Sequence, residues 1–101
     1  MALKKIIEAE YLTKRQQMLI DIANYRILEG FRLSHEVGKE GEYLWKQYFN
    51  NAAQTFTNLA RISKLNPEVT EQALDAAKRL RRMANDKDGK RIEYLKRLGR
   101  L

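Results

Sequence analysis

Two stretches of the chain place apolar side chains at alternating spacings of four and three residues, which is the spacing of one face of an α-helix. The first stretch consists of Trp45, Phe49, Ala52, Phe56 and Leu59. The second consists of Val69, Ala73, Ala76, Leu80 and Met83. A helix with one apolar seam must bury that seam against another element. The pattern therefore predicts two amphipathic helices that share a core.

A short polar junction separates these two helices. Asn66 is a preferred N-cap residue, Pro67 is tolerated at the first helical position, and Glu68 suits the positive end of the helix dipole. Turn-forming residues follow the second seam after Asn85. We expect helices near residues 42–64 and 67–85, packed as an antiparallel hairpin.

A third long helix is expected near residues 13–36. Thr13 and Gln16 have the spacing of a capping box, in which each side chain bonds the backbone N–H of the other residue. A helix that starts at this box and one continuous helix over residues 3–35 both fit the pattern. Two glycines within residues 37–41 predict the turn into the next helix.

The apolar positions within residues 18–33 cover much more than a third of the helix circumference. They are residues 18, 19, 20, 22, 23, 25, 27, 28, 31 and 33. A stripe this wide predicts burial on two sides, either as the central helix of a bundle or as a subunit interface. We therefore expect a homo-oligomer that forms through residues 18–33.

Composition supports an all-α fold. The 101 residues include one proline and five glycines, and good helix formers dominate. Short amphipathic helices are expected at both ends, over residues 2–11 and 90–101. The sequence predicts one helical domain, residues 1–101, built as a small bundle of antiparallel helical hairpins without a β-sheet. Within it, residues 86–101 form a basic amphipathic segment that could move relative to the bundle.

The net charge of +7 is confined to the end of the chain. Residues 1–77 hold ten basic and ten acidic side chains, whereas residues 78–101 hold ten basic and three acidic ones. A contiguous basic region is the electrostatic footprint of phosphate-backbone binding, which gains free energy from counterion release. The predicted nucleic-acid-binding residues are Lys78, Arg79, Arg81, Arg82, Lys87, Lys90, Arg91, Lys96, Arg97 and Arg100.

The aromatic residues favour one class of nucleic acid. Trp45, Phe49 and Phe56 lie on an apolar seam, and Tyr94 alone lies among the C-terminal cations. Stacking on unpaired bases needs exposed aromatic rings. We therefore expect duplex DNA or structured RNA rather than a single strand.

Uncharged polar residues dominate the exposed side of the helix near residues 42–64. They are Asn50, Asn51, Gln54 and Asn58. A solvated helix more often shows Glu and Lys there. These side chains could donate hydrogen bonds to a partner, or they could form an ordinary wet surface.

Residue types that carry catalysis or bind metals are scarce. The chain has no cysteine, and His35 is its one histidine. The carboxylates do not form the Glu-x-x-His motif of di-iron bundles, and the glycines lack the Lys-Ser/Thr of a phosphate-binding loop. We expect no enzymatic activity, no metal site and no cofactor.

Localisation is predicted from the same composition. The absence of cysteine favours a reducing compartment, and we expect the cytoplasm. No apolar run is long enough to span a bilayer, and the first residues lack the apolar core of a secretory signal.

Two classes of function remain open. The first is a non-enzymatic protein that grips the phosphate backbone of DNA or RNA through a basic C-terminal face with low sequence specificity. The second is a protein–protein adaptor, inhibitor or assembly subunit that docks an acidic partner through its helices. The last helix could also cap the core, lie on an anionic membrane or dock into a partner's groove.

Overall fold

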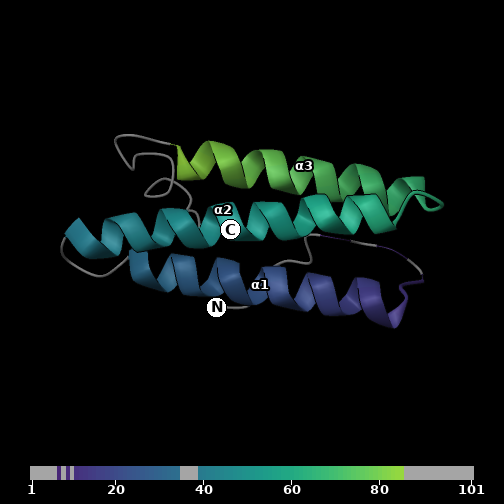
Figure 1. Cartoon of the computed structure of the whole chain (residues 1–101), viewed down its shortest axis with the longest axis horizontal. Helices are drawn as coiled ribbons and strands as arrows, with labels where there is room; N and C mark the ends of the chain where they lie inside the picture. Colours follow the sequence, from purple (N-terminus) through teal and green to yellow (C-terminus); the bar gives the residue numbers. More distant parts are fainter. Residues whose placement is uncertain (1–6, 8, 10, 35–38, 86–101) are drawn as a thin grey trace.

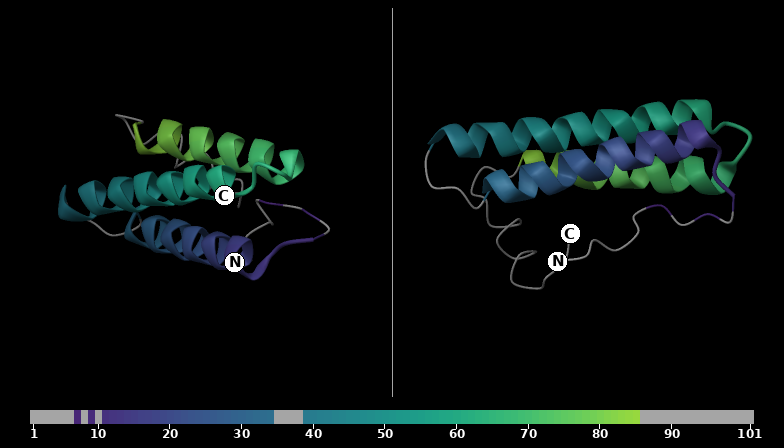
Figure 2. Two further views of the ribbon diagram at one scale, coloured as in Figure 1. Left: turned by 45° about the vertical axis from the view of Figure 1, so that its right-hand side comes forward. Right: turned by 90° about the horizontal axis from the view of Figure 1, so that it is seen from below.

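The computed structural model describes Ile7, Ala9, residues 11–34 and residues 39–85. These residues form three α-helices: α1, Lys14–Ser34; α2, Lys39–Ile62; and α3, Pro67–Ala84. Figures 1 and 2 show the helices side by side, each antiparallel to the next. The described residues contain no strand. The expected all-α bundle of three long helices is therefore confirmed.

The start of α1 is set by the predicted capping box. The backbone N–H of Gln16 donates to Thr13 Oγ1 at 3.1 Å, and the backbone N–H of Thr13 donates to Gln16 Oε1 at 2.9 Å. Residues 11–13 are not helical. A single continuous helix over residues 3–35 is therefore wrong, because the capping box satisfies two N–H groups that such a helix would use internally.

The short helix expected over residues 2–11 is not formed at the positions that the structure describes. Ile7, Ala9 and Tyr11 are all non-helical. Ile7 is buried in the core of the bundle, and Ala9 packs against that core. These contacts bury apolar surface without a helix. The remaining residues of this segment, and the expected helix over residues 90–101, lie outside the described residues.

The junction between α2 and α3 follows the prediction closely. The Asn66 side chain accepts a hydrogen bond from the backbone N–H of Val69 at 3.4 Å, and Pro67 occupies the first turn of α3. The turn is closed by the backbone N–H of Asn66, which donates to the carbonyl of Ser63 at 2.8 Å. At its other end, α2 begins earlier than expected and takes in Gly41.

The core consists of the two predicted seams and one side of α1. All ten seam residues are buried, and the Trp45 and Phe49 rings meet edge to face at 5.6 Å between centroids. α1 contributes Ile20, Ala23 and Ile27. Burial of a large apolar side chain contributes roughly 1.5–3 kcal/mol to stability. These residues therefore hold the bundle together.

The central helix is α2, which packs along both α1 and α3 (Figure 1). The interpretation of residues 18–33 as a central helix is wrong, because one side of α1 stays exposed to solvent. Small side chains such as Ala53 and Ala60 widen the seam of α2, and both are buried. One broad seam can therefore meet two neighbouring helices.

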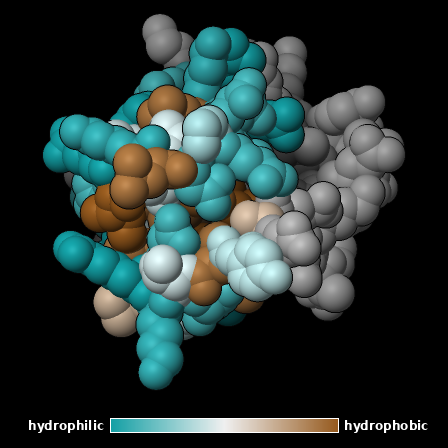
Figure 3. Space-filling model, turned by 90° about the vertical axis from the view of Figure 1, so that its right-hand side faces the viewer, coloured by the Kyte–Doolittle hydropathy of each residue, from teal (hydrophilic) through white to brown (hydrophobic). Residues whose placement is uncertain are grey.

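Two further properties of the described residues bear on function. None of their helices combines the length and the hydropathy that a bilayer-spanning segment requires. At the end of the bundle where α1 starts and α2 turns into α3, hydrophilic side chains surround exposed apolar ones (Figure 3). Leu65, in the turn between α2 and α3, is fully exposed.

Candidate nucleic-acid interface

Four of the ten predicted binding residues are described, and all four lie exposed on α3. They are Lys78, Arg79, Arg81 and Arg82. The other six lie outside the described residues: Lys87, Lys90, Arg91, Lys96, Arg97 and Arg100. The second half of α3 therefore contributes the described part of the predicted site.

Three of these cations share one side of α3. Lys78, Arg81 and Arg82 follow one another at helical spacings of three and four residues, which places them together on the surface. They lie opposite the buried seam residues Ala76 and Leu80. Phosphate groups could approach this side of the helix without displacing a core residue.

Arg79 differs from its neighbours. Its guanidinium forms an ion pair of 2.9 Å with Asp75, and both side chains are more than half exposed. Exposed pairs of this kind contribute about 0–1 kcal/mol to stability. The pair nevertheless offsets the charge of Arg79, so this residue contributes less positive potential than the other three.

Arg81 connects the cations of α3 to the exposed side of α2. Its guanidinium donates a hydrogen bond of 3.2 Å to Thr57 Oγ1, and the Thr57 hydroxyl donates in turn to the carbonyl of Ala53. The Thr57 hydroxyl therefore acts both as a hydrogen-bond acceptor and as a hydrogen-bond donor. The bond directs the Arg81 guanidinium along the surface between the two helices.

The opposite flank of α2 repeats this arrangement with a residue of α1. The Arg26 guanidinium donates a hydrogen bond of 2.6 Å to Thr55 Oγ1 and one of 3.3 Å to the carbonyl of Asn51. The Thr55 hydroxyl donates to the same carbonyl. The exposed side of α2 is thus bordered by an arginine from each neighbouring helix.

From residue 44 to its end, the exposed side of α2 is rich in amides and free of acids. No Asp or Glu occurs between Glu42 and Glu68. The exposed amide residues are Gln47, Asn50, Asn51, Gln54 and Asn58. Gln54 Nε2 donates to Asn58 Oδ1 at 3.1 Å, which aligns two of them along the helix. Between residues 44 and 62, no carboxylate on this side of α2 would repel a phosphate group.

α2 also supplies cations of its own. Arg61 is exposed in its last turn, and Lys64 is exposed in the turn that follows. Lys46 Nζ lies 5.5 Å from the centre of the Trp45 ring near the other end of α2. At 1.5 Å per residue, Lys46 and Arg61 are about 22 Å apart along the axis. That distance corresponds to roughly six base pairs of a duplex, at about 3.4 Å each.

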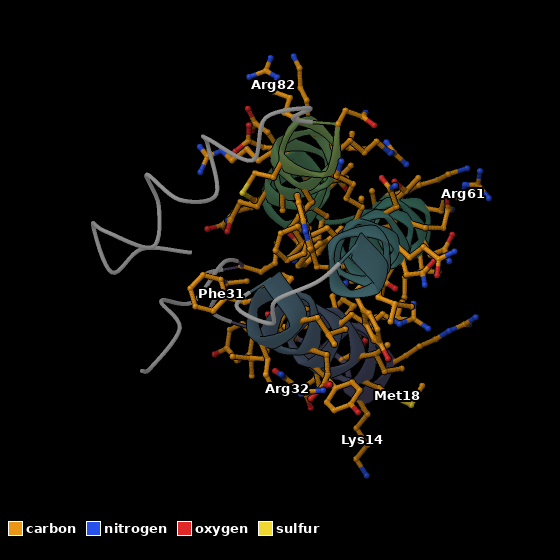
Figure 4. All side chains as sticks on the ribbon, turned by 90° about the vertical axis from the view of Figure 1, so that its left-hand side faces the viewer. Lys14, Met18, Phe31, Arg32, Arg61 and Arg82 are labelled. Atoms are coloured by element: carbon orange, nitrogen blue, oxygen red, sulfur yellow. The ribbon has the colours of Figure 1, made fainter. Side chains whose placement is uncertain are left out.

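We call the combined surface the α2–α3 face. It consists of the exposed amides of α2 together with Lys46, Thr57, Arg61, Lys64, Lys78, Arg81 and Arg82. Arg61 and Arg82 project from α2 and α3 into solvent in Figure 4. Glu71 is an acidic residue on the same side of α3 as Lys78, two helical turns before it, and Asp75, which pairs with Arg79, lies between them.

Part of the charge pattern on α3 has a purely structural benefit. Glu68 lies in its first turn, and Arg81 and Arg82 lie in its last turn. Each such placement stabilises a helix by about 0.3–1 kcal/mol through its dipole. The absence of acidic residues along α2 brings no comparable stabilisation through the helix dipole. It is therefore the stronger indication of an anionic partner.

Reasoning from the sequence did not find Arg61 and Lys64 as site residues. Residues 1–77 have no net charge, so a charge count over that stretch hides a local excess on α2. The useful signal is the run without acidic residues between Glu42 and Glu68. The contact between Arg81 and Thr57 depends on how α2 and α3 pack.

Comparison with protein-family models, with curated proteins and with solved structures found no match for this chain. The candidate site therefore rests on the residues and geometry described above.

Proposed function

We propose that this chain is a non-enzymatic nucleic-acid-binding protein that grips the phosphate backbone through the α2–α3 face with low sequence specificity. The observation that carries the proposal is the hydrogen bond of 3.2 Å from Arg81, on the cationic side of α3, to Thr57, which borders the acid-free stretch of α2. Cations from two helices thereby adjoin a surface of neutral hydrogen-bond donors.

The chemistry of the face suits a phosphate backbone. Each Lys or Arg that neutralises a phosphate releases condensed counterions, which is the main source of non-specific affinity. Arginine can grip a phosphate with two parallel hydrogen bonds. Amide side chains such as those of Asn50 and Gln54 can donate to phosphate and sugar oxygens without reading a base. Low sequence specificity follows from this set of contacts.

The aromatic residues favour a duplex or structured RNA over a single strand. Trp45, Phe49 and Phe56 are buried in the core, which leaves their rings no access to unpaired bases. None of the described exposed residues on the α2–α3 face is aromatic. The six cations beyond Asn85 would extend the same positive footprint, as part of the proposal.

The first experiment is fluorescence-anisotropy binding of the full chain to a random DNA duplex, a DNA single strand and a hairpin RNA at two salt concentrations. We expect micromolar or tighter binding to the duplex and the hairpin at low salt, with a steep loss as salt rises. Absence of binding to all three probes at low salt would contradict the proposal.

A fourth probe separates the proposal from an acidic protein partner. Polyglutamate of matched total charge presents carboxylates on a flexible chain. We expect it to bind more weakly than the duplex, because carboxylates along a flexible chain do not reproduce the spacing of phosphates. Tighter binding of polyglutamate would favour the adaptor function instead.

A further inference from the structure

The side of α1 that faces away from α2 carries an exposed apolar stripe. Four residues form this α1 outer face: Met18, Ile22, Tyr25 and Leu28. Met18 is 55% exposed and Tyr25 is 62% exposed. A shallow depression on the same side is lined by Lys14, Gln17, Met18, Asp21, Ile22 and Tyr25. Exposed apolar surface rimmed by polar groups is typical of a protein contact site.

We propose that the α1 outer face binds the same face of a second copy of this chain, with the two α1 helices antiparallel. A two-fold symmetric contact needs a surface that complements itself, so that residue i meets residue j and j meets i. The α1 outer face has this property in one apolar pair, Met18 with Tyr25, and in one charged pair at its rim, Lys14 with Glu29.

The complementarity follows from the positions of two residue pairs. The midpoint between Met18 and Tyr25 lies halfway between residues 21 and 22, and the midpoint between Lys14 and Glu29 lies at the same place. A two-fold axis there sets Met18 opposite Tyr25 of the second copy. It also sets Lys14 opposite Glu29 of the second copy.

Both pairings are favourable. A methionine sulfur beside an aromatic ring contributes about 0.3–1.5 kcal/mol. Lysine and glutamate at the rim attract each other and select this register over shifted ones. Glu29 already forms an ion pair of 2.9 Å with Arg32, so the Lys14 ammonium would join a small network rather than an isolated charge.

Asp21 provides an internal check on the register. It lies beside the proposed axis, where the two copies of its carboxylate come close together. Gln17 Nε2 donates to Asp21 Oδ1 at 2.9 Å, which relieves only part of the repulsion. The proposed register therefore predicts that removal of this charge strengthens the dimer.

The dimer leaves the α2–α3 face open. Lys14 and Met18 project from α1 in the direction opposite to that of Arg82 (Figure 4). Two basic faces would then lie on opposite sides of one particle. The inference does not depend on the proposed function, because it rests on other residues and is tested without nucleic acid.

The expected dimer is weak. Four partly exposed side chains of one helix bury less than the roughly 800 Å² per partner that stable complexes commonly bury. We therefore expect a dissociation constant on the order of 10–100 µM. Analytical ultracentrifugation of the full chain across that concentration range tests for the dimer. The monomer mass is 11.9 kDa, and a dimer doubles it.

The test uses a charge swap. Lys14→Glu and Glu29→Lys, made singly, should each weaken the dimer several-fold, and the double variant should recover most of the loss. Asp21→Asn should tighten the dimer. Met18→Lys with Tyr25→Lys should abolish it, whereas Leu74→Lys, at a half-exposed leucine of α3, should leave it unchanged. Circular dichroism confirms that each variant folds.

Two results would overturn the proposal. The first is a monomer at every concentration, which would leave the α1 outer face to a different protein. The second is a dimer that the charge swap does not restore, which would exclude the antiparallel register.

Discussion

The side-chain amide of Gln16 donates a hydrogen bond of 3.0 Å to the hydroxyl of Ser63, and this bond joins the start of α1 to the end of α2. Both side chains are buried. Gln16 also completes the capping box with Thr13, and the Ser63 carbonyl accepts a bond of 2.6 Å from the Thr70 hydroxyl. One polar network therefore connects all three helices at one end of the bundle.

Replacement of Gln16 should destabilise the protein more than its position near a helix start suggests. Gln16→Ala removes the capping amide and leaves the Ser63 hydroxyl without its donor. We expect the free energy of unfolding to fall by about 1–3 kcal/mol. Urea denaturation followed by circular dichroism measures it.

Gln17→Ala is the matched control, because the Gln17 side chain is exposed and its one described hydrogen bond goes to Asp21. Its effect should stay within about 0.5 kcal/mol. Equal losses for the two variants would mean that the buried bond to Ser63 contributes nothing.

A second prediction concerns the close approach of α1 and α2 at Gly30. A Cβ atom built on Gly30 would lie 3.0 Å from Cδ1 and Cε1 of the Phe49 ring and 3.1 Å from Cβ of Tyr48. Gly30→Val should therefore force the helices apart and cost about 1–3 kcal/mol, although valine is the better helix former. Thermal unfolding measures the loss.

The companion variant is Phe49→Leu. If the ring causes the clash, the double variant should be more stable than the sum of the two single losses predicts, with a coupling of about 0.5–3 kcal/mol. Strict additivity would show that the contact between Gly30 and Phe49 is not the reason for the glycine.

A third prediction is a gain of binding. Glu71 is exposed on the same side of α3 as Lys78 and repels phosphate groups there. Glu71→Gln should tighten duplex binding several-fold at low salt, and anisotropy measures it. A gain cannot arise from unfolding, which makes this variant informative.

Glu29→Gln is its control, because it makes the same change in net charge on α1. Charges more than about 10 Å away are largely screened at 0.1 M salt. Glu29→Gln should therefore leave affinity nearly unchanged. If both variants gain equally, binding depends on total charge and not on the α2–α3 face.

How much could be predicted from the sequence depended on the range of the interactions involved. Local signals were sufficient for the long helices: the seam spacing around Phe49 and Leu80, the capping box at Thr13 and the N-cap at Asn66 were all confirmed. Local signals could not predict which helix is central, since that depends on which apolar seam packs against two neighbouring helices.

The same distinction holds for the candidate site. The exposed position of Lys78 and Arg82 followed from their spacing against the apolar seam of α3. The amides and Arg61 of α2 join these cations in one surface only because α2 and α3 pack together, and the sequence pattern alone does not predict that packing. The width of the apolar stripe on α1 predicted burial on two sides, whereas Tyr25 on its outer side is exposed in the single chain.

The most direct test of the α2–α3 face compares two charge-matched double variants of the full chain in duplex binding across a salt series. Lys78→Gln with Arg82→Gln removes two charges from the face. Arg15→Gln with Arg32→Gln removes two charges from exposed positions of α1, outside the face. Each lost phosphate contact lowers the slope of log affinity against log salt by about 0.9.

We predict that the first double variant loses nearly two units of that slope and at least tenfold in affinity at low salt. The second should stay close to the unmodified chain. Equal slopes for the two variants would contradict the central claim that the α2–α3 face holds the phosphate backbone.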